Sequence, residues 1–468
     1  MEILCVMLMA AITASSASSS TVTDFSQLDK AIQEELKTTN TPGCAVAIVS
    51  GDKIVYAKGF GVANLETDQP VKPETLFMIG STTKMFTAYT LLSVAENGKL
   101  DINKPIGNYI KGLSPKLSGV TASELLSMTA GLKDISSVPQ DGKWDYQSGL
   151  EKYVRSLNDS MLFTEPGEIF SYSNPGFSTA GYLTEIVSGK PYADAVKERV
   201  LGPLGMNNST FHLEEAVTYP MSVGHDDFTG KIRVQRPYDE VTPMWPGGFL
   251  ISNIYDMAKF AAALMNNGTL SGEQILSPSI IKEMSSPHAR IFSAVTNGSY
   301  GYGTELINYY GIDTVGHAGN AMGFTSVFMT MPERKLALII LNNGAVRDMP
   351  NLTRKAFELM MVPLKPDVVK TLEMNESEME QYVGNYSQDT GSVYSIKARD
   401  GKLLFSQGGV LLPGQQPFEY SVVKLARGQF GIMFPGYPDP WPIGLIKGKD
   451  GKVKYLHRGE RAYVRMAS

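Results

Sequence analysis

Apolar and polar positions follow strand-like and helix-like spacings in turn through the first three quarters of the chain. Apolar runs typical of buried strands open and close this region, and helical patterns fill its middle. The strand runs cover residues 44–49, 54–57, 325–329 and 336–341, and the helical patterns cover 82–98, 176–188, 192–201 and 255–266. Strands from both ends of such a region pair in one sheet covered by helices. The pattern therefore predicts an α/β or α+β domain over residues 24–362.

The spacing changes after two prolines at 363 and 366. Helical periods disappear beyond about residue 381, and short strand patterns follow one another. They cover 393–398, 402–406, 420–425, 429–434, 452–457 and 461–466, with Asp400-Gly401 and Asp450-Gly451 as expected hairpin turns. These features predict a linker over 363–375 and a small antiparallel β-barrel over 376–468 that limits access to a site or binds a partner.

The N-terminus is an apolar run, Ile3 to Ile12, followed by small residues around Ala17. This order is typical of a secretory signal peptide, although no Lys or Arg precedes the run. Residues 1–20 are therefore expected to be a signal peptide, which predicts a secreted or periplasmic location. The run is too short to span a bilayer and no later apolar stretch is long enough, so no membrane span is expected.

Composition excludes some classes of function. The 468 residues are 43% hydrophobic and 19% charged, which is typical of a globular protein, and the net charge of −5 argues against a nucleic-acid partner. Two cysteines, Cys5 and Cys44, cannot form an all-cysteine zinc site, and the five histidines lack metal-binding spacing. Neither a metal nor another cofactor is predicted.

The first candidate for chemistry is Ser81-Thr82-Thr83-Lys84. Residues i and i+3 share a helix face, so Lys84 can reach the Ser81 hydroxyl, and apolar surroundings would lower the pKa of the amine. Ser81 follows a glycine and opens a long apolar helix, whereas Ser279 with Lys282 is a decoy that follows a proline. The alternative for Ser81 is an ordinary helix N-cap.

The second candidate is Tyr172-Ser173-Asn174, in a loop bracketed by Pro and Gly that precedes a helix. A tyrosine near a lysine can exist partly as phenolate and move protons, and an asparagine can donate to a substrate carbonyl and accept from a lysine. The alternative is that this segment is only a surface turn rich in Ser and Asn, without a catalytic role.

The third candidate is His317-Ala318-Gly319-Asn320, just before the strand run at 325. Its small residues would let a substrate backbone lie along the strand. A histidine with an unperturbed pKa near about 6.5 is a weaker anion site than lysine and gains charge toward pH 6. The alternative is that His317 only hydrogen-bonds the neighbouring strand. The other H-x-G, His457-Arg458-Gly459, is interpreted as structural.

Together, the Ser-Lys, Tyr-Asn and His-Gly motifs resemble the penicillin-recognising serine hydrolases, the group of class C β-lactamases, serine D-peptidases and D-aminopeptidase-like enzymes. The resemblance extends over about residues 25–360 and includes segments at 124–132, 181–191, 203–206 and 247–252. The part that begins at Tyr382 resembles the lipocalin-like tail of D-aminopeptidase-type members. The resemblance as a whole implies a β-lactamase/transpeptidase-like fold, with an antiparallel sheet flanked by helices and an all-helical region. It also implies a second, smaller domain that is a β-barrel.

The resemblance also implies a role for each motif residue. Ser81 would be the acylated nucleophile, and Lys84 and Tyr172 would move its proton. Substrate would contact Asn174, His317 and Gly319, and the backbone N–H groups of Ser81 and Asn320 would form the oxyanion hole. Histidine at 317 replaces a lysine that β-lactamases commonly have, which weakens the case for β-lactamase activity.

These observations predict a secreted serine hydrolase that works through an acyl-enzyme, as a D-amino-acid-preferring peptidase or aminopeptidase on small peptides. Two rivals remain open. One is a carboxylesterase or weak class C-type β-lactamase, with an ester or β-lactam substrate. The other is a non-catalytic receptor for peptidoglycan fragments. Whether the chain forms a homo-oligomer is also open.

Overall fold

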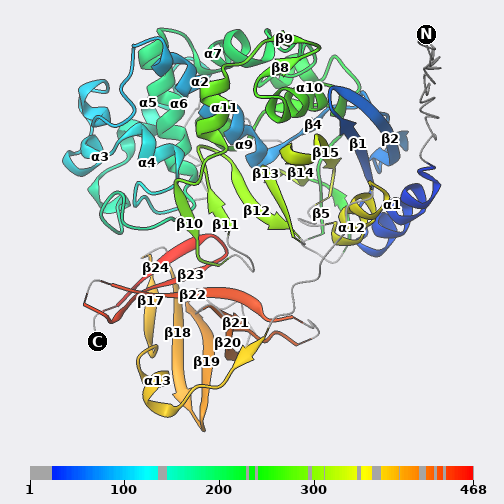
Figure 1. Cartoon of the computed structure of the whole chain (residues 1–468). Helices are drawn as coiled ribbons and strands as arrows, with labels where there is room; N and C mark the ends of the chain where they lie inside the picture. Colours follow the sequence, from blue (N-terminus) through cyan, green and yellow to red (C-terminus); the bar gives the residue numbers. More distant parts are fainter. Residues whose placement is uncertain are drawn as a thin grey trace, which may run out of the picture.

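The computed structural model describes residues 24–134, 145–227, 231–237, 241–293, 298–309, 311–344, 349–360, 370–388, 391–409, 418–425, 429–435, 439–448 and 450–466. The expected signal peptide, residues 1–20, and the start of the expected linker, residues 363–369, lie outside these ranges. Figure 1 shows a large domain of helices and sheet, with the smaller barrel beside it.

The large domain is built on an antiparallel sheet that both ends of the region form, as the sequence predicts. Within the described residues its strand order is β10-β11-β12-β13-β14-β15-β1-β2-β3. The bounds are β1 Gly43–Ser50, β2 Lys53–Asn64, β3 Gln69–Pro70, β10 Ala289–Ile291, β11 Gly298–Tyr300, β12 Glu305–Tyr309, β13 Ile312–Ala321, β14 Phe324–Met331 and β15 Leu336–Asn342.

Alternate residues of β1 face two different helical layers. Cys44, Val46 and Ile48 pack against α1 Ser26–Thr38 and α12 Pro350–Leu359 on one side. Ala45 and Ala47 belong to the main core on the other side, with α2 Thr83–Glu96 and α10 Ile254–Met265. Because successive side chains of a strand point to opposite faces, an unbroken apolar run indicates a sheet covered on both sides.

Helices between the two halves of the sheet form the all-helical region. They are α3 Pro115–Gly119, α4 Ala122–Leu126, α5 Gly149–Ser156, α6 Asn174–Ser188, α7 Tyr192–Val196, α8 Leu213–Ala216, α9 Trp245–Gly248 and α11 Pro278–Met284. Three small antiparallel pairs accompany them: β4 Phe77–Met78 with β7 Ile251–Ser252, β5 His225–Asp226 with β6 Arg233–Val234, and β8 Thr269–Leu270 with β9 Glu273–Gln274.

The C-terminal part is a closed antiparallel barrel of eight strands, because β20 pairs with β21 as well as with β19. Its core includes Tyr386, Ile396, Phe405 and Ile443. The elements are β16 Thr371–Leu372, α13 Glu376–Glu380, β17 Gly384–Ser387, β18 Ser392–Arg399, β19 Lys402–Gly409, β20 Glu419–Leu425, β21 Phe430–Ile432, β22 Trp441–Lys447, β23 Val453–Arg458 and β24 Arg461–Arg465.

The structure adds strands that the hydrophobic pattern does not predict. β12 and β13 carry polar and small residues among the apolar ones, and β22 contains a proline, so none reads as an apolar run. β16 lies within the expected linker, and it pairs with β20 at the edge of the barrel sheet. The last part of 363–375 therefore belongs to the barrel.

The two domains meet where β23 and β24 face the large domain (Figure 1). Ile169 packs with Tyr455 and Ala462 in a small apolar cluster across the contact. His457 is buried between Ser293 and the Phe170 carbonyl, which fits its interpretation as structural. Along the described chain no helix is long and apolar enough to cross a membrane.

Candidate active site

The turn before α2 fixes the position of Ser81. Gly80 has φ of +55°, and a Cβ on it would lie 2.3 Å from the Asn320 nitrogen, so only glycine fits this turn. Ser81 then lies in a short 3-10 turn, Gly80–Thr82, that continues into α2. Ser81 is partly exposed while its neighbours in the turn are buried.

Lys84 lies one turn further along and is fully buried. Its ammonium has three acceptors: the Ser81 Oγ at 3.1 Å, the Asn174 Oδ1 at 2.8 Å and the Gly247 carbonyl at 2.5 Å. Burial lowers the pKa of Lys84 to about 7, because a charged amine is poorly solvated inside the protein. A large fraction of Lys84 is therefore neutral at physiological pH and can accept the Ser81 proton.

Tyr172 and Asn174 reach the same point from the start of α6. The Ser173 side chain caps this helix by accepting from the Gly176 N–H, which fixes the backbone between the two functional side chains. The Lys84 Nζ lies 4.8 Å from the centre of the Tyr172 ring. The motif is thus brought to the Ser81–Lys84 pair, as the sequence predicts.

The pKa of Tyr172 differs from the expectation of a partial phenolate. Burial holds this pKa well above its usual value, and a hydrogen bond from Ser81 opposes the shift only in part. Tyr172 is therefore a protonated phenol near neutral pH, which can donate a proton, whereas the Lys84 amine can accept one.

His317 precedes strand β14, as expected, but it also lies within a strand of its own, β13. It is 2% exposed, with its Nε2 2.9 Å from the Tyr300 hydroxyl and its Nδ1 2.6 Å from the Ala318 carbonyl. Burial, with the nearby Lys84 charge, lowers the pKa of His317 to about 3. The expected gain of charge toward pH 6 is therefore wrong, and His317 stays neutral.

Strand β13 packs tightly against the Ser81 turn. A Cβ on Gly319 would lie 2.0 Å from the Ile79 carbonyl. The Thr82 hydroxyl donates to the His317 carbonyl over 3.0 Å, and the Ser326 hydroxyl donates to the Ile79 carbonyl over 2.7 Å. These contacts bring the backbones of Ser81 and Asn320 together, as an oxyanion hole made of these two N–H groups requires.

Sequence reasoning missed Asp134 and Arg461. The Asp134 Oδ1 accepts from the Asn174 backbone N–H at 2.9 Å and from the Asn174 Nδ2 at 3.1 Å. Its Oδ2 accepts from Arg461 of the barrel, with the Arg461 Nε at 2.9 Å. Asp134 lies two residues after the segment 124–132, which could have pointed to it. No local pattern connects Arg461 with a site far away in sequence.

The decoy Ser279 lies elsewhere. It is in the first turn of α11 and its hydroxyl donates to the Glu96 carboxylate, with the Ser277 hydroxyl at 2.8 Å. Within the described residues, no group of three or more His, Cys, Asp or Glu side chains could hold a metal ion. The chemistry available at Ser81 is thus nucleophilic attack assisted by a lysine and a tyrosine.

Comparison with known proteins agrees with this geometry. The beta-lactamase family profile matches residues 28–359. The protein flp of Staphylococcus aureus (strain N315) is 23% identical over 335 residues, which are 70% of this chain and 64% of that protein, so the chain spans less than two thirds of this relative's length.

Two solved structures show the same fold. The structure of SurE with D-Leu has a TM-score of 0.72 at 21% identity, over 94% of this chain and 99% of that one. The D-amino acid amidase from Ochrobactrum anthropi SV3 in complex with L-phenylalanine has a TM-score of 0.59 at 25% identity, over 72% and 98%. The family profile covers more than half of the sequence. The chain therefore belongs to the beta-lactamase family.

Proposed function

We propose that this protein is a serine acyl hydrolase that forms an acyl-enzyme on Ser81. One observation carries the proposal: a buried lysine with a pKa near 7 lies 3.1 Å from the hydroxyl of a partly exposed serine. The contact places the amine where it can take the serine proton, and a pKa near 7 makes its uncharged form available, as a general base requires.

The steps follow from the contacts. Neutral Lys84 removes the Ser81 proton as the hydroxyl attacks the substrate carbonyl carbon. The N–H groups of Ser81 and Asn320 stabilise the negative charge that develops on the carbonyl oxygen. The Tyr172 phenol donates a proton to the leaving group and recovers one through Lys84. Water then attacks the ester carbonyl by the same route in reverse, which frees Ser81.

The charges around the site favour a substrate with an amine rather than a carboxylate near the scissile bond. His317 is neutral, so the third motif offers no cation for a carboxylate. The carboxylates of Asp134, Glu460 and Glu305 all act to raise the pKa of Lys84, whereas burial and the Arg461 guanidinium act to lower it. A site with this excess of negative charge attracts an ammonium group. We therefore propose small peptides or amides with a free amino end.

A D-residue on the acyl side is our further proposal. It is supported by the fold shared with a D-amino acid amidase and with a protein solved together with D-Leu. We also propose that the protein acts outside the cytoplasm, on the signal-like pattern of residues 1–20. Cleavage of that segment would appear as a shorter N-terminus by mass spectrometry of the protein isolated from its source.

The test is a panel of p-nitroanilides and p-nitrophenyl esters of D- and L-amino acids, each free and N-acetylated, run beside nitrocefin. We expect kcat/KM for the free D-amino-acid amides to exceed that of their N-acetyl forms by at least about tenfold, or about 1.4 kcal/mol. Ser81→Ala is the control that removes the nucleophile. Turnover of esters and nitrocefin alone would favour the esterase or β-lactamase alternative. A wild-type protein that hydrolyses nothing and takes no fluorophosphonate label would favour the receptor.

A further inference from the structure

The barrel touches the large domain at the segment that carries Tyr172 and Asn174. The Tyr172 N–H donates to the Glu460 carbonyl over 2.8 Å, and the Ala462 N–H donates to the Ser171 hydroxyl over 3.2 Å. Gln388 also donates to the Ser171 hydroxyl, over 3.1 Å. The hairpin of β23 and β24 thus holds the backbone of this segment.

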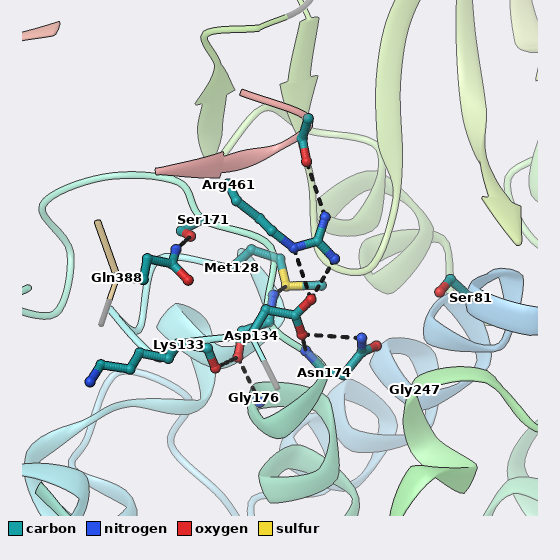
Figure 2. A network of polar contacts seen from close by, with 12 residues as sticks. Ser81, Met128, Lys133, Asp134, Ser171, Asn174, Gly176, Gly247, Gln388 and Arg461 are labelled. Carbon is teal, nitrogen blue, oxygen red and sulfur yellow. Dashed lines mark hydrogen bonds and ion pairs between the residues drawn. The ribbon is translucent and has the colours of Figure 1, made fainter. Parts of the chain in front are cut away.

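A series of side-chain contacts connects Arg461 of this hairpin with Lys84, the proposed base. Figure 2 shows Arg461 directed at Asp134, and Asp134 directed at Asn174. Asn174 in turn accepts from the Lys84 Nζ at 2.8 Å. The Asp134 side chain is 3% exposed and that of Arg461 is 32% exposed, so the ion pair closes this edge of the site.

The contacts from Arg461 to Asp134 and from Asp134 to Asn174 determine which end of the Asn174 amide faces Lys84. The two ends of an amide have nearly the same shape, but a carboxylate only accepts hydrogen bonds. Because the Asp134 Oδ1 takes both the backbone N–H and the Nδ2 of Asn174, the Oδ1 of Asn174 must point to Lys84. Arg461 occupies the other oxygen, which keeps the carboxylate in this orientation.

The positive charge of Arg461 also lies close to Tyr172 and acts on Lys84. Its guanidinium lies 5.2 Å from the centre of the Tyr172 ring. The charged and titratable groups around Lys84 are Asp134, Glu460, Glu305, Arg461, Tyr172 and His317. Asp134 favours the ammonium form of Lys84 and Arg461 disfavours it, so the two charges of the ion pair oppose each other at Lys84.

We propose that Arg461, from the barrel, is a positioning residue of the active site, which orients Asp134 and Asn174 toward Lys84 and balances the Asp134 charge. The inference rests on the proposed function, since it concerns the activation of Ser81. It gives the barrel a direct part in turnover rather than only a gating role.

The test compares the full chain with Arg461→Met, Asp134→Asn and the double variant, by the rate of Ser81 labelling with a fluorophosphonate between pH 5.5 and 9. Arg461→Met should lower the rate at pH 7 by about 10- to 100-fold, the range for a misplaced catalytic group, and move the acid limb to higher pH. Asp134→Asn should move that limb to lower pH. The double variant should return it toward the wild-type position, because neither charge remains.

Arg399→Met is the matched control, because Arg399 is also an arginine of the barrel but pairs with Glu419 rather than with Asp134. It should leave the rate and the pH profile unchanged. Arg461→Lys keeps the charge but not the guanidinium geometry, so it should lower the rate without moving the limb, and it serves if Arg461→Met does not fold. Limbs that stay in place in both Asp134→Asn and Arg461→Met, with rates within twofold of wild type in these variants and in Arg461→Lys, would overturn the inference. Failure of the wild type to label Ser81 would instead overturn the proposed function.

Discussion

Two helices of this protein begin with a Ser-x-x-Lys motif. The two motifs differ in the burial of the lysine and in the turn that precedes the serine. Ser81 follows a left-handed glycine and opens α2, in which Lys84 is buried. Ser279 follows Pro278 in α11, where its hydroxyl donates to the Glu96 carboxylate. The motif places serine and lysine on one helix face in both cases. Burial of the lysine and the shape of the preceding turn make the difference.

The comparison shows that the motif becomes reactive through its environment. The amine of Lys84 has lost solvation and has a pKa near 7, whereas the second motif lies at the surface. The Ser279 hydroxyl donates to the Glu96 carboxylate, and both Ser279 and Lys282 are exposed to solvent. The predictions below pair a change at the Ser81 site with a matched change elsewhere in the protein.

The largest effect is expected from removal of the amine. Lys84→Met keeps the volume of the side chain but leaves no base, so kcat/KM on a p-nitrophenyl ester should fall by at least about 10⁴-fold. Lys282→Met, in the second motif, should change kcat/KM by less than twofold. A folded Lys84→Met protein with a tenth or more of wild-type activity would exclude Lys84 as the base.

The tyrosine beside each motif gives the next contrast. Tyr172→Phe removes the proton donor and should lower kcat by about 10²- to 10⁴-fold on an anilide. Tyr89→Phe removes a hydroxyl that accepts from the Ser277 N–H beside the second motif, and kcat should stay within twofold. Steady-state kinetics on the two variants decides the matter, and a kcat of Tyr172→Phe within twofold of wild type would show that the Tyr172 hydroxyl is not the proton donor.

The turn before Ser81 can be tested with two glycines of the same backbone conformation. Gly80→Ala would push a Cβ to 2.3 Å from the Asn320 nitrogen, which displaces one donor of the oxyanion hole, so kcat should fall by about 10²- to 10³-fold. Gly98→Ala meets nothing within 4 Å at φ of +76°. It should cost about 1 kcal/mol of stability and leave kcat unchanged. Parallel kinetics and urea unfolding separate the two effects.

Much of this arrangement could be predicted from the sequence. The apolar runs predict β1, β14, β15 and the helix α2. For the strands, the reason is that both faces of the sheet are buried, so their sequences contain runs of consecutive apolar residues. The three motifs predict Ser81, Lys84, Tyr172 and Asn174, which the structure brings together. Local patterns carry this information because each motif lies at the boundary of its own element.

The rest depends on contacts that no local pattern records. β13 was not predicted, because His317, Gly319 and Asn320 are not apolar, and its place in the sheet comes from pairing with β14. The pKa of His317 depends on burial, which a motif does not reveal. Arg461 lies 327 positions after Asp134 in the sequence, and the packing of the two domains brings them together.

The smallest effect concerns the two H-x-G histidines, which are buried and neutral. Burial lowers the pKa of both His317 and His457 to about 3. The unfolded chain takes up these protons near pH 6.5 and the folded protein does not, so stability is full above pH 6.5 and falls as the pH drops toward 3. Each histidine contributes a slope of about 1.4 kcal/mol per pH unit below pH 6.

His457→Gln should therefore reduce the pH dependence of the unfolding free energy by about 1.4 kcal/mol per unit between pH 6 and pH 4.5, measured by urea unfolding against wild type. His317→Gln should reduce it similarly. A slope equal to that of the wild type in both variants would mean that these rings already titrate in the folded protein.

The most direct test of the account is to map the fluorophosphonate adduct by peptide mass spectrometry while the labelling rate is followed from pH 5.5 to pH 8.5. The account predicts an adduct on the peptide that contains Ser81, none on the peptide that contains Ser279, and a rate that rises through a midpoint near pH 7 as Lys84 loses its proton. An adduct on Ser279, or a Ser81 labelling rate that does not change over this pH range, would contradict it.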